Sequence, residues 1–230
     1  MSLRERGKRR RVERALQAAR RILVEEGAEG LQMRAVAERA ELSVRTLYNQ
    51  FGSKAEVVTA LASRALDELA AELEALAIED DGLALSRAII TVSVARFHAD
   101  RELMRPLLAA GYSGAAAEGG ALLFQQARAL QENALEAAMR ARQLGRTVAA
   151  RHLAHQVLSA YNQAALSWAC RDLDHRAFEA QALHAWACLL LGFARGPARA
   201  RLLDDLAELE QAMERSLTRH TRSRPADLGL

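Results

Sequence analysis

Residues 32–51, QMRAVAERAELSVRTLYNQF, decide the fold of the N-terminal part of this 230-residue chain. Their apolar spacing predicts two short helices, over 33–40 and 44–50, separated by a tight turn. Ser43 stands where it caps the second helix, and the small Ala37 lets the two helices cross closely. The segment therefore predicts a helix-turn-helix. The side chains expected to face inward are those of Met33, Val36, Ala37, Ala40, Leu42, Leu47 and Phe51.

The second of these helices presents polar side chains outward from its first turns. Arg45 can pair with guanine and Asn49 with adenine in the major groove of DNA. Thr46 can contact a phosphate or a thymine methyl group, and Tyr48 can donate a hydrogen bond to a phosphate. This combination is typical of a recognition helix. The residues expected to face DNA here are Ser43, Val44, Arg45, Thr46, Tyr48 and Asn49.

A capping box at Ser53 and Glu56 predicts the start of a long helix over 54–77. Lys54 lies in its first turn, where the helix dipole disfavours a cation. A helix N-terminus with a lysine beside it makes a good phosphate site. We therefore expect Lys54 to contact the DNA backbone; the alternative is a lysine that extends into solvent.

The rest of the chain carries helical periodicity and no sustained strand alternation. A first helix is expected to end at Gly27, and residues 111–120, rich in glycine, are expected to form a mobile loop. The fold class is all-α: an N-terminal three-helix bundle with the helix-turn-helix, then a larger helical domain. We expect domains over 1–54 and 55–222 and a tail over 223–230. Further helices are predicted over 83–99, 102–110, 120–143, 147–171, 178–195 and 198–219.

Charge is distributed unevenly along the chain. Residues 1–54 hold 13 Lys and Arg against 7 Asp and Glu, whereas the remainder holds 19 against 22. A basic end on a mildly acidic body indicates a polyanionic partner, or else a solvated basic tail. Two cysteines, Cys170 and Cys188, are too few for a disulfide framework and indicate buried thiols in a reducing compartment. With no signal segment and no membrane span expected, the predicted location is the cytoplasm.

The run over 27–56, GAEGLQMRAVAERAELSVRTLYNQFGSKAE, resembles the N-terminal domain of the TetR family of bacterial regulators. The matching marks are the helix-ending glycine, the alanine in the first short helix, Ser-x-x-Thr-Leu-Tyr-x-x-Phe and the Ser-Lys pair. The detailed resemblance covers residues 9–60. Two positions depart from the family pattern: Glu41 replaces the usual turn glycine, which costs roughly 1–2 kcal/mol in a left-handed conformation, and Gln32 replaces a capping threonine.

The resemblance implies roles for individual residues. Arg45 and Thr46 would reach base edges or nearby phosphates, while Tyr48 and Lys54 would hold the phosphate backbone. Arg34 would add a base or phosphate contact. Residues 9–11, all arginine, would enter an adjacent groove or remain a flexible tail.

The same resemblance implies a homodimer held by the helices over 147–171 and 178–195. The second is apolar nearly all round, and a helix without a polar face must be covered on every side. The alternative is a central helix within a monomer. A dimer implies a double-stranded operator that is an inverted repeat, with half-sites about one DNA turn apart.

A small-molecule effector site among the middle helices is also implied by the resemblance, with no cofactor. Each residue proposed for it has a plain core role as its alternative. The expected lining residues are Phe97, His98, Met104, Tyr112, Phe124, Met139, Tyr161, Asn162 and Trp168.

Other classes of function have less support in the residues. His152 and His155 share a helix face but lack a third ligand, so no metal site is expected. No phosphate-binding glycine loop and no catalytic cysteine signature is present, so no enzyme activity is predicted. A helical partner-binding protein with only non-specific DNA affinity is the main alternative, and a thiol switch through the two cysteines a minor one. The sequence predicts a sequence-specific transcriptional regulator, most simply a repressor released from its operator by a small molecule.

Overall fold

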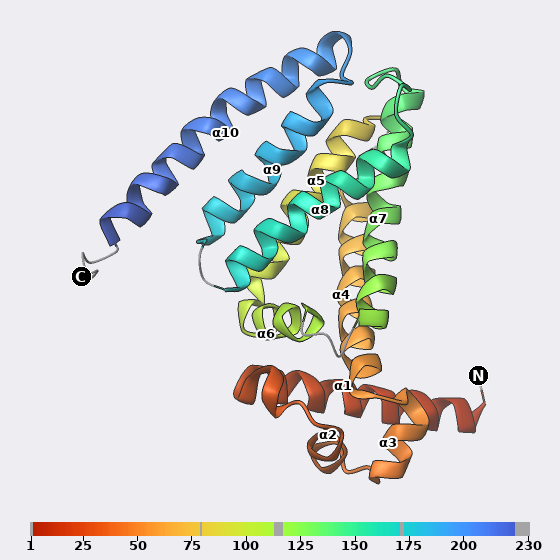
Figure 1. Cartoon of the computed structure of the whole chain (residues 1–230). Coiled ribbons are helices and arrows are strands. Elements are labelled where there is room, and N and C mark those ends of the chain that lie inside the picture. Colours follow the sequence, from red (N-terminus) through yellow and green to blue (C-terminus); the bar gives the residue numbers. More distant parts are fainter. Residues whose placement is uncertain (1, 79, 113–116, 171–172, 224–230) are drawn as a thin grey trace. The chain divides into compact units, whose positions relative to one another are not determined.

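The structure, a computed structural model, describes residues 2–78, 80–112, 117–170 and 173–223, with all their side chains except those of 109–112, 117–124 and 215–223. Within these ranges the chain is helical and no residue belongs to a strand, which confirms the all-α fold class (Figure 1). The helices are α1 (Leu3–Gly30), α2 (Met33–Arg39), α3 (Val44–Phe51), α4 (Lys54–Ala75), α5 (Gly82–Ala99), α6 (Arg101–Tyr112), α7 (Ala117–Arg140), α8 (Ala150–Ala169), α9 (His175–Leu191) and α10 (Gly196–Ser223).

The chain divides into two compact units. The first contains residues 1–71 and 99–127, and the second contains residues 72–98 and 128–230. The first unit therefore includes the helix-turn-helix, most of α4 and all of α6. The second unit includes nearly all of α5 together with α8, α9 and α10.

Helix α1 begins earlier than the apolar periodicity indicates. Ser2 caps it: its Oγ accepts from the Glu5 amide at 3.2 Å, and the Glu5 carboxylate accepts from the Ser2 amide at 2.7 Å. This capping box adds a stable start to a basic stretch that lacks apolar residues. Residues 9–11 are therefore helical, and the alternative of a flexible tail is wrong. Gly27 adopts φ 71° and ψ −167°, so the regular helix breaks where the sequence predicts.

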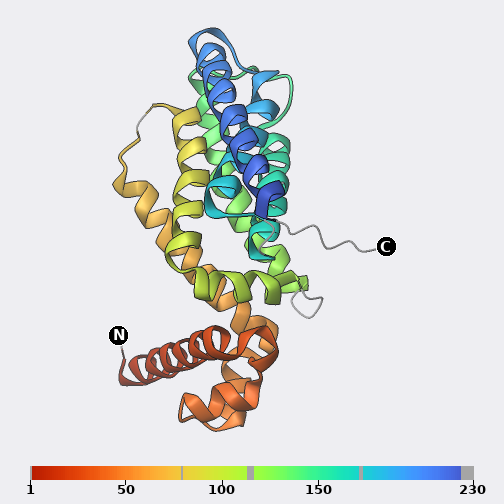
Figure 2. The same cartoon turned by 90° about the vertical axis from the view of Figure 1, so that its left-hand side faces the viewer.

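Helices α2 and α3 pack together against one side of α1 (Figure 2). Val36, Ala37 and Leu47 are at most 1% exposed and form the centre of this packing. Burying a leucine or valine side chain of this kind contributes about 1.5–3 kcal/mol. Leu42 and Phe51 are half-buried, at the edge of the same core.

The turn between α2 and α3 contains the left-handed residue that the TetR pattern implies. Glu41 has φ 52°, and the Leu42 amide donates to the Ala37 carbonyl at 2.9 Å. Arg14 of α1 supports this turn because its guanidinium donates to the Glu41 carbonyl and carboxylate, both at 3.4 Å. The turn therefore keeps its shape without glycine.

In the second unit α9 packs against α8 on one side and α10 on the other. Phe178, Ala187 and Leu190 of α9 are fully buried. α8 and α10 thus cover much of this helix within one chain, while Ala185, Leu189 and Leu191 remain half-exposed. Sequence periodicity alone did not reveal how closely α10 covers it.

A hydrogen-bonded polar group lies inside this apolar unit. The Ser86 hydroxyl donates to Gln131 Oε1 at 2.7 Å and accepts from Trp186 Nε1 at 2.9 Å, while Gln131 Nε2 donates to the Ser86 carbonyl at 3.1 Å. All three residues are at most 2% exposed. Because these polar groups have partners, their hydrogen bonds offset the cost of removing them from water, and the group joins α5, α7 and α9.

Gly82 permits a very close approach of α5 to α7. A Cβ atom at this position would lie 2.1 Å from the Ala138 amide nitrogen and 2.5 Å from the Ala134 carbonyl oxygen. Backbone atoms cannot give way as flexible side chains do, so only glycine fits here.

Residues 111–120 are not the continuous loop that their glycines predict. α6 extends to Tyr112 and α7 begins at Ala117, so Gly119 and Gly120 are helical, while 113–116 lie outside the described residues. Each helical glycine costs only about 1 kcal/mol relative to alanine. The alanine and leucine residues that surround the pair, all strong helix formers, outweigh that cost.

Candidate functional site

The N-terminus of α3 is capped, and its first turns are presented to solvent. Ser43 Oγ accepts from the Thr46 amide at 3.0 Å and lies 2.7 Å from Thr46 Oγ1. Val44 is 40% exposed and Tyr48 is 49% exposed, although both are large side chains. Leu47, on the opposite face, is fully buried.

The other polar residues of this face are also accessible. Arg45 and Asn49 are exposed, Thr46 is half-buried, and Arg34 is exposed on the first turn of α2. Among the described residues, no ion pair involves Arg34 or Arg45. The structure therefore leaves an arginine, an asparagine and a tyrosine exposed on one short, rigid helix.

Lys54 has a structural partner that the sequence did not indicate. Its ammonium donates to the Ala28 carbonyl at 2.9 Å, in a partly buried position. Ala28 belongs to the final turn of α1, where carbonyl groups lack helical partners. Lys54 thus ties the start of α4 to the end of α1. Ser53 caps α4 as predicted, because its Oγ accepts from the Glu56 amide at 3.2 Å.

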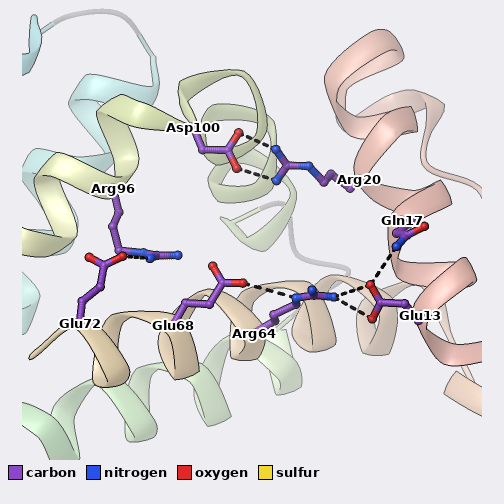
Figure 3. A network of polar contacts seen from close by, with 8 residues as sticks. All are labelled: Glu13, Gln17, Arg20, Arg64, Glu68, Glu72, Arg96 and Asp100. Carbon is purple, nitrogen blue, oxygen red and sulfur yellow. Dashed lines mark hydrogen bonds and ion pairs between the residues drawn. The ribbon is translucent and has the colours of Figure 1, made fainter. Parts of the chain in front are cut away.

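Two groups of ionic contacts fasten α1 within the first unit, as Figure 3 shows. Arg64 of α4 donates to both carboxylate oxygens of Glu13, at 3.0 and 2.9 Å, and Gln17 donates to the same carboxylate at 3.0 Å. The hydrogen bond from Arg64, supported by that from Gln17, lowers the pKa of Glu13. Arg20 reaches the corner between α5 and α6, where it donates to both oxygens of Asp100 at 2.5 and 3.0 Å.

The sequence did not predict the two ion pairs that join Glu13 with Arg64 and Arg20 with Asp100. A signal was present only in the i, i+4 spacing of Glu13 with Gln17 and of Arg64 with Glu68, which the structure records as contacts on each helix. Nothing in the sequence indicates that residues 51 and 80 positions apart meet.

Four aromatic side chains gather in the second unit. Phe97 of α5 lies 6.2 Å from Tyr161, 5.9 Å from Trp168 and 6.1 Å from Phe178, measured between ring centroids. Phe178 also lies 5.5 Å from Tyr161 and 5.8 Å from Trp168. We call these four residues the aromatic cluster. Three of these residues are expected from the sequence to line an effector site, whereas Phe178 is not, because it lies in a helix that is apolar nearly all round.

Two histidines meet in the second unit: His98, which follows Phe97 in the sequence, and His175, which begins α9. The rings of His98 and His175 are stacked with centroids 4.1 Å apart. Burial, and secondarily the neighbouring His98, lower the pKa of His175, so this residue favours its neutral form.

Comparison with known proteins agrees with this architecture. Residues 15–61 match the family model described as bacterial regulatory proteins, tetR family. Residues of the chain are 39% identical over 70 positions to the HTH-type transcriptional repressor KstR of Mycolicibacterium smegmatis, covering 30% of this chain. The N-terminal domain of this chain is therefore of the TetR family type. The aligned part spans 34% of the length of that curated relative.

Solved structures extend the likeness of fold beyond the TetR N-terminal domain. Thermus thermophilus FadR, a TetR-family repressor solved with lauroyl-CoA, aligns with TM-score 0.67 at 19% identity, covering 81% of this chain and 97% of that one. SmeT, the repressor of the multidrug efflux pump SmeDEF of Stenotrophomonas maltophilia, aligns with TM-score 0.63 at 20% identity, covering 81% and 92%. The second unit therefore shares the helical fold of these TetR-family proteins.

The residues expected to line an effector site do not all come together. Phe97, Tyr161 and Trp168 meet in the aromatic cluster, and His98 meets His175. Met104 is buried on α6 in the first unit, and Met139 is buried on α7 in the second. Asn162 is half-buried on α8. The side chains of Tyr112 and Phe124 lie outside the described residues.

The two thiols and the remaining histidines give no further site. Cys170 and Cys188 are both free and exposed, so the expectation of buried thiols is wrong. Burial of part of the side chain, with the charge of Glu210, raises the pKa of Cys188. Among the described residues, no three His, Cys, Asp or Glu are placed to hold a metal ion, and no helix has the length and apolar character of a membrane span.

Proposed function

We propose that this protein is a sequence-specific DNA-binding transcriptional regulator, a repressor that a small-molecule effector releases from its operator. The observation that carries the proposal is the exposed face of α3, where Arg45, Tyr48 and Asn49 project from a capped helix that is anchored by the buried Leu47. These side chains have no packing role that explains their identity. They do have the chemistry that reads base edges and phosphates.

Each residue of this face has a distinct proposed contact. Arg45 donates to the acceptor edge of guanine, and Asn49 pairs with adenine. Tyr48 donates to a phosphate, where its contact sets position and not sequence. Thr46 offers its methyl group to thymine because its hydroxyl is occupied by Ser43. Arg34, on α2, adds a further base or phosphate contact.

The first turns of α1 supply additional positive charge in this proposal. Arg14 faces the turn between α2 and α3, since it bonds to Glu41. Arg10 and Arg11 lie one helical turn earlier and therefore extend the same side of α1. Both are placed to contact phosphates that flank the bases read by α3. Each such contact makes binding more sensitive to salt but adds no sequence preference.

We further propose a homodimer formed through α8 and α9, which would read an inverted repeat. Because α10 covers one side of α9, the partner would meet the outward face of α8 and α9, where Ser159 and Cys188 are exposed and Ala185 is half-exposed. The expected particle has twice the chain mass of 25.2 kDa, measured by light scattering. Ala185→Arg should shift it to one chain mass; a monomeric wild-type protein would contradict the dimer.

The aromatic cluster is the proposed location of effector recognition. Its faces and edges suit apolar or aromatic groups, and the structural relatives include complexes with lauroyl-CoA and triclosan, which both carry such groups. An effector acts only if it prefers one of the two conformations of the protein. Lauroyl-CoA and triclosan are therefore the first probes, with quenching of Trp168 fluorescence as the readout and Trp168→Phe as the control for signal from Trp186.

Selection of duplexes from a random pool, at about 0.15 M salt, tests the function. An enriched inverted repeat is the expected result, as is release of that duplex by an effector that perturbs Trp168. Salt-sensitive binding with no enriched sequence would overturn the proposal and favour a helical partner-binding protein whose basic end is incidental. In the proposed role the protein works where its DNA is, in the bacterial cytoplasm, and catalyses no reaction.

A further inference from the structure

The backbone passes between the two compact units at three places. It crosses within α4 between Ala71 and Glu72, at the end of α5 between His98 and Ala99, and within α7 between Ala127 and Arg128. The middle crossing is distinguished by what the residues on its two sides contact.

At this crossing, residues 97–100 make contacts with both units: the first two contact residues of the second unit, and the last contacts α1 of the first. Phe97 belongs to the aromatic cluster, and His98 is stacked on His175 of α9. Only two residues later, Asp100 holds Arg20 of α1 through both of its carboxylate oxygens. A side chain in the proposed effector site is thus separated by three peptide bonds from a side chain that holds α1.

The ion pair between Arg20 and Asp100 constrains both the separation and the relative orientation of the two side chains. Two parallel N–H···O bonds between a guanidinium and a carboxylate constrain the orientation of both groups. Glu13, seven residues before Arg20 and hence on the same side of α1, makes the second two-oxygen contact, with Arg64 of α4. α1 is therefore held at two points along one side.

Movement of α1 moves the recognition helix. Arg39 of α2 is paired with Glu25 and Glu26 of α1, and Arg14 supports the turn that precedes α3. Since α1, α2 and α3 also share a buried core, they turn together. The orientation of α1 therefore decides where the exposed face of α3 is presented.

We propose that Asp100 is a positioning residue that, through Arg20, sets the orientation of the DNA-reading helices and hence the half-site separation that the protein accepts. The inference rests on the proposed function, because half-site separation has meaning only for a protein that reads two half-sites.

Stability and positioning are separable at this bridge. The side chains of Arg20 and Asp100 are 48% and 33% exposed, and exposed ion pairs contribute at most about 1 kcal/mol to folding. Variants without the bridge should therefore remain folded. A coupling of about 1 kcal/mol, by contrast, already changes a binding preference about fivefold.

The test measures affinity for the selected inverted repeat and for versions with one or two base pairs inserted between the half-sites. Each inserted base pair moves one half-site by about 3.4 Å and rotates it about the DNA axis. Wild-type protein should discriminate strongly against the insertions. Asp100→Asn and Arg20→Gln should each lower this discrimination about fivefold or more, with the base preference inside a half-site unchanged.

The double variant and a matched control make the outcome specific. If the two residues act as one pair, Asp100→Asn with Arg20→Gln should behave as either single change does. Arg87 and Asp205 form an ion pair of nearly equal exposure, 44% and 29%, within the second unit. Arg87→Gln should leave discrimination at the wild-type value. If Asp100→Asn disturbs the start of α6, Arg20→Gln alone still tests whether the pair sets the discrimination against insertions.

Two negative results have different meanings. If wild-type protein selects an inverted repeat and both single variants keep full discrimination against insertions, the positioning role is wrong and the proposed function stands. If wild-type protein selects no sequence, the proposed function fails, and the inference fails with it.

Discussion

The two compact units differ in how their polar side chains are used. In the first unit the contacts of Arg20 and Arg64 are exposed ion pairs on the surface of an apolar core. In the second, Ser86, Gln131 and Trp186 bond to one another in the interior. An exposed pair contributes little stability but fixes an orientation, whereas a buried polar group is costly when its partner is lost. Loss of a polar contact in the first unit should therefore change stability little, whereas loss of one in the second should lower stability more.

The largest expected loss of stability comes from removing one ring of the aromatic cluster. Phe178→Ala removes a fully buried ring that touches Phe97, Tyr161 and Trp168, and should lower the free energy of unfolding by about 3–5 kcal/mol. Thermal denaturation followed by circular dichroism measures the loss. Phe178→Leu leaves a smaller cavity and should cost less. Equal stability of wild type and Phe178→Ala would show that this cluster does not hold the second unit together.

Removing one hydroxyl from the buried hydrogen-bonded group of Ser86, Gln131 and Trp186 should lower the free energy of unfolding somewhat less. Ser86→Ala leaves the Trp186 N–H and Gln131 Oε1 without their hydroxyl partner, while Gln131 Nε2 keeps the Ser86 carbonyl, which predicts a loss of about 2–4 kcal/mol. Ser159→Ala is the matched control, because this exposed hydroxyl bonds only to the His155 carbonyl of its own helix; it should change stability by at most about 0.5 kcal/mol. Urea titration compares the two. Similar losses in both variants would remove the contrast between buried and exposed contacts.

The left-handed turn offers a stabilising change. Glu41→Gly relieves the strain of a non-glycine residue at φ 52° while Arg14 retains its bond to the backbone carbonyl, and should raise stability by about 1 kcal/mol. Glu38→Gly, in the regular part of α2, should instead destabilise by about 1 kcal/mol. Melting temperatures of the two variants should move in opposite directions. A decrease in both would mean that the Glu41 carboxylate matters more than its backbone conformation.

The smallest expected effect belongs to the Glu13–Arg64 contact. Glu13→Gln should lower stability at neutral pH by less than about 1 kcal/mol. Because the contact lowers the pKa of Glu13 in the folded protein, its contribution is present above the pKa of the unfolded chain. It is lost as the pH falls through the lowered folded value. Unfolding measured from pH 7 down to pH 3 should therefore bring wild type and variant together in acid. A difference that stays constant with pH would exclude a role for the carboxylate charge.

Local chemistry explains why the helix-turn-helix could be predicted and much of the rest could not. Ser43, Leu47 and the turn at Glu41 act on neighbours only a few residues away, so their spacing in the sequence carries the information. The Arg20–Asp100 and Glu13–Arg64 contacts join distant residues with no periodic signature. Phe178 and the covering of α9 by α10 depend on which helices become neighbours. Lys54 was misjudged as lacking a structural role because its partner, the Ala28 carbonyl, is backbone.

The central claim is that the exposed face of α3 reads DNA sequence, and a panel of single-base changes in the selected operator tests it most directly. Arg45→Ala should lose its preference at one position in each half-site, by about 1–3 kcal/mol, and keep it elsewhere. Tyr48→Phe should weaken binding evenly across the panel. If Arg45→Ala instead weakened every duplex equally and kept the wild-type preference at every position, Arg45 would be only a phosphate contact, and base reading by this face of α3 would be contradicted.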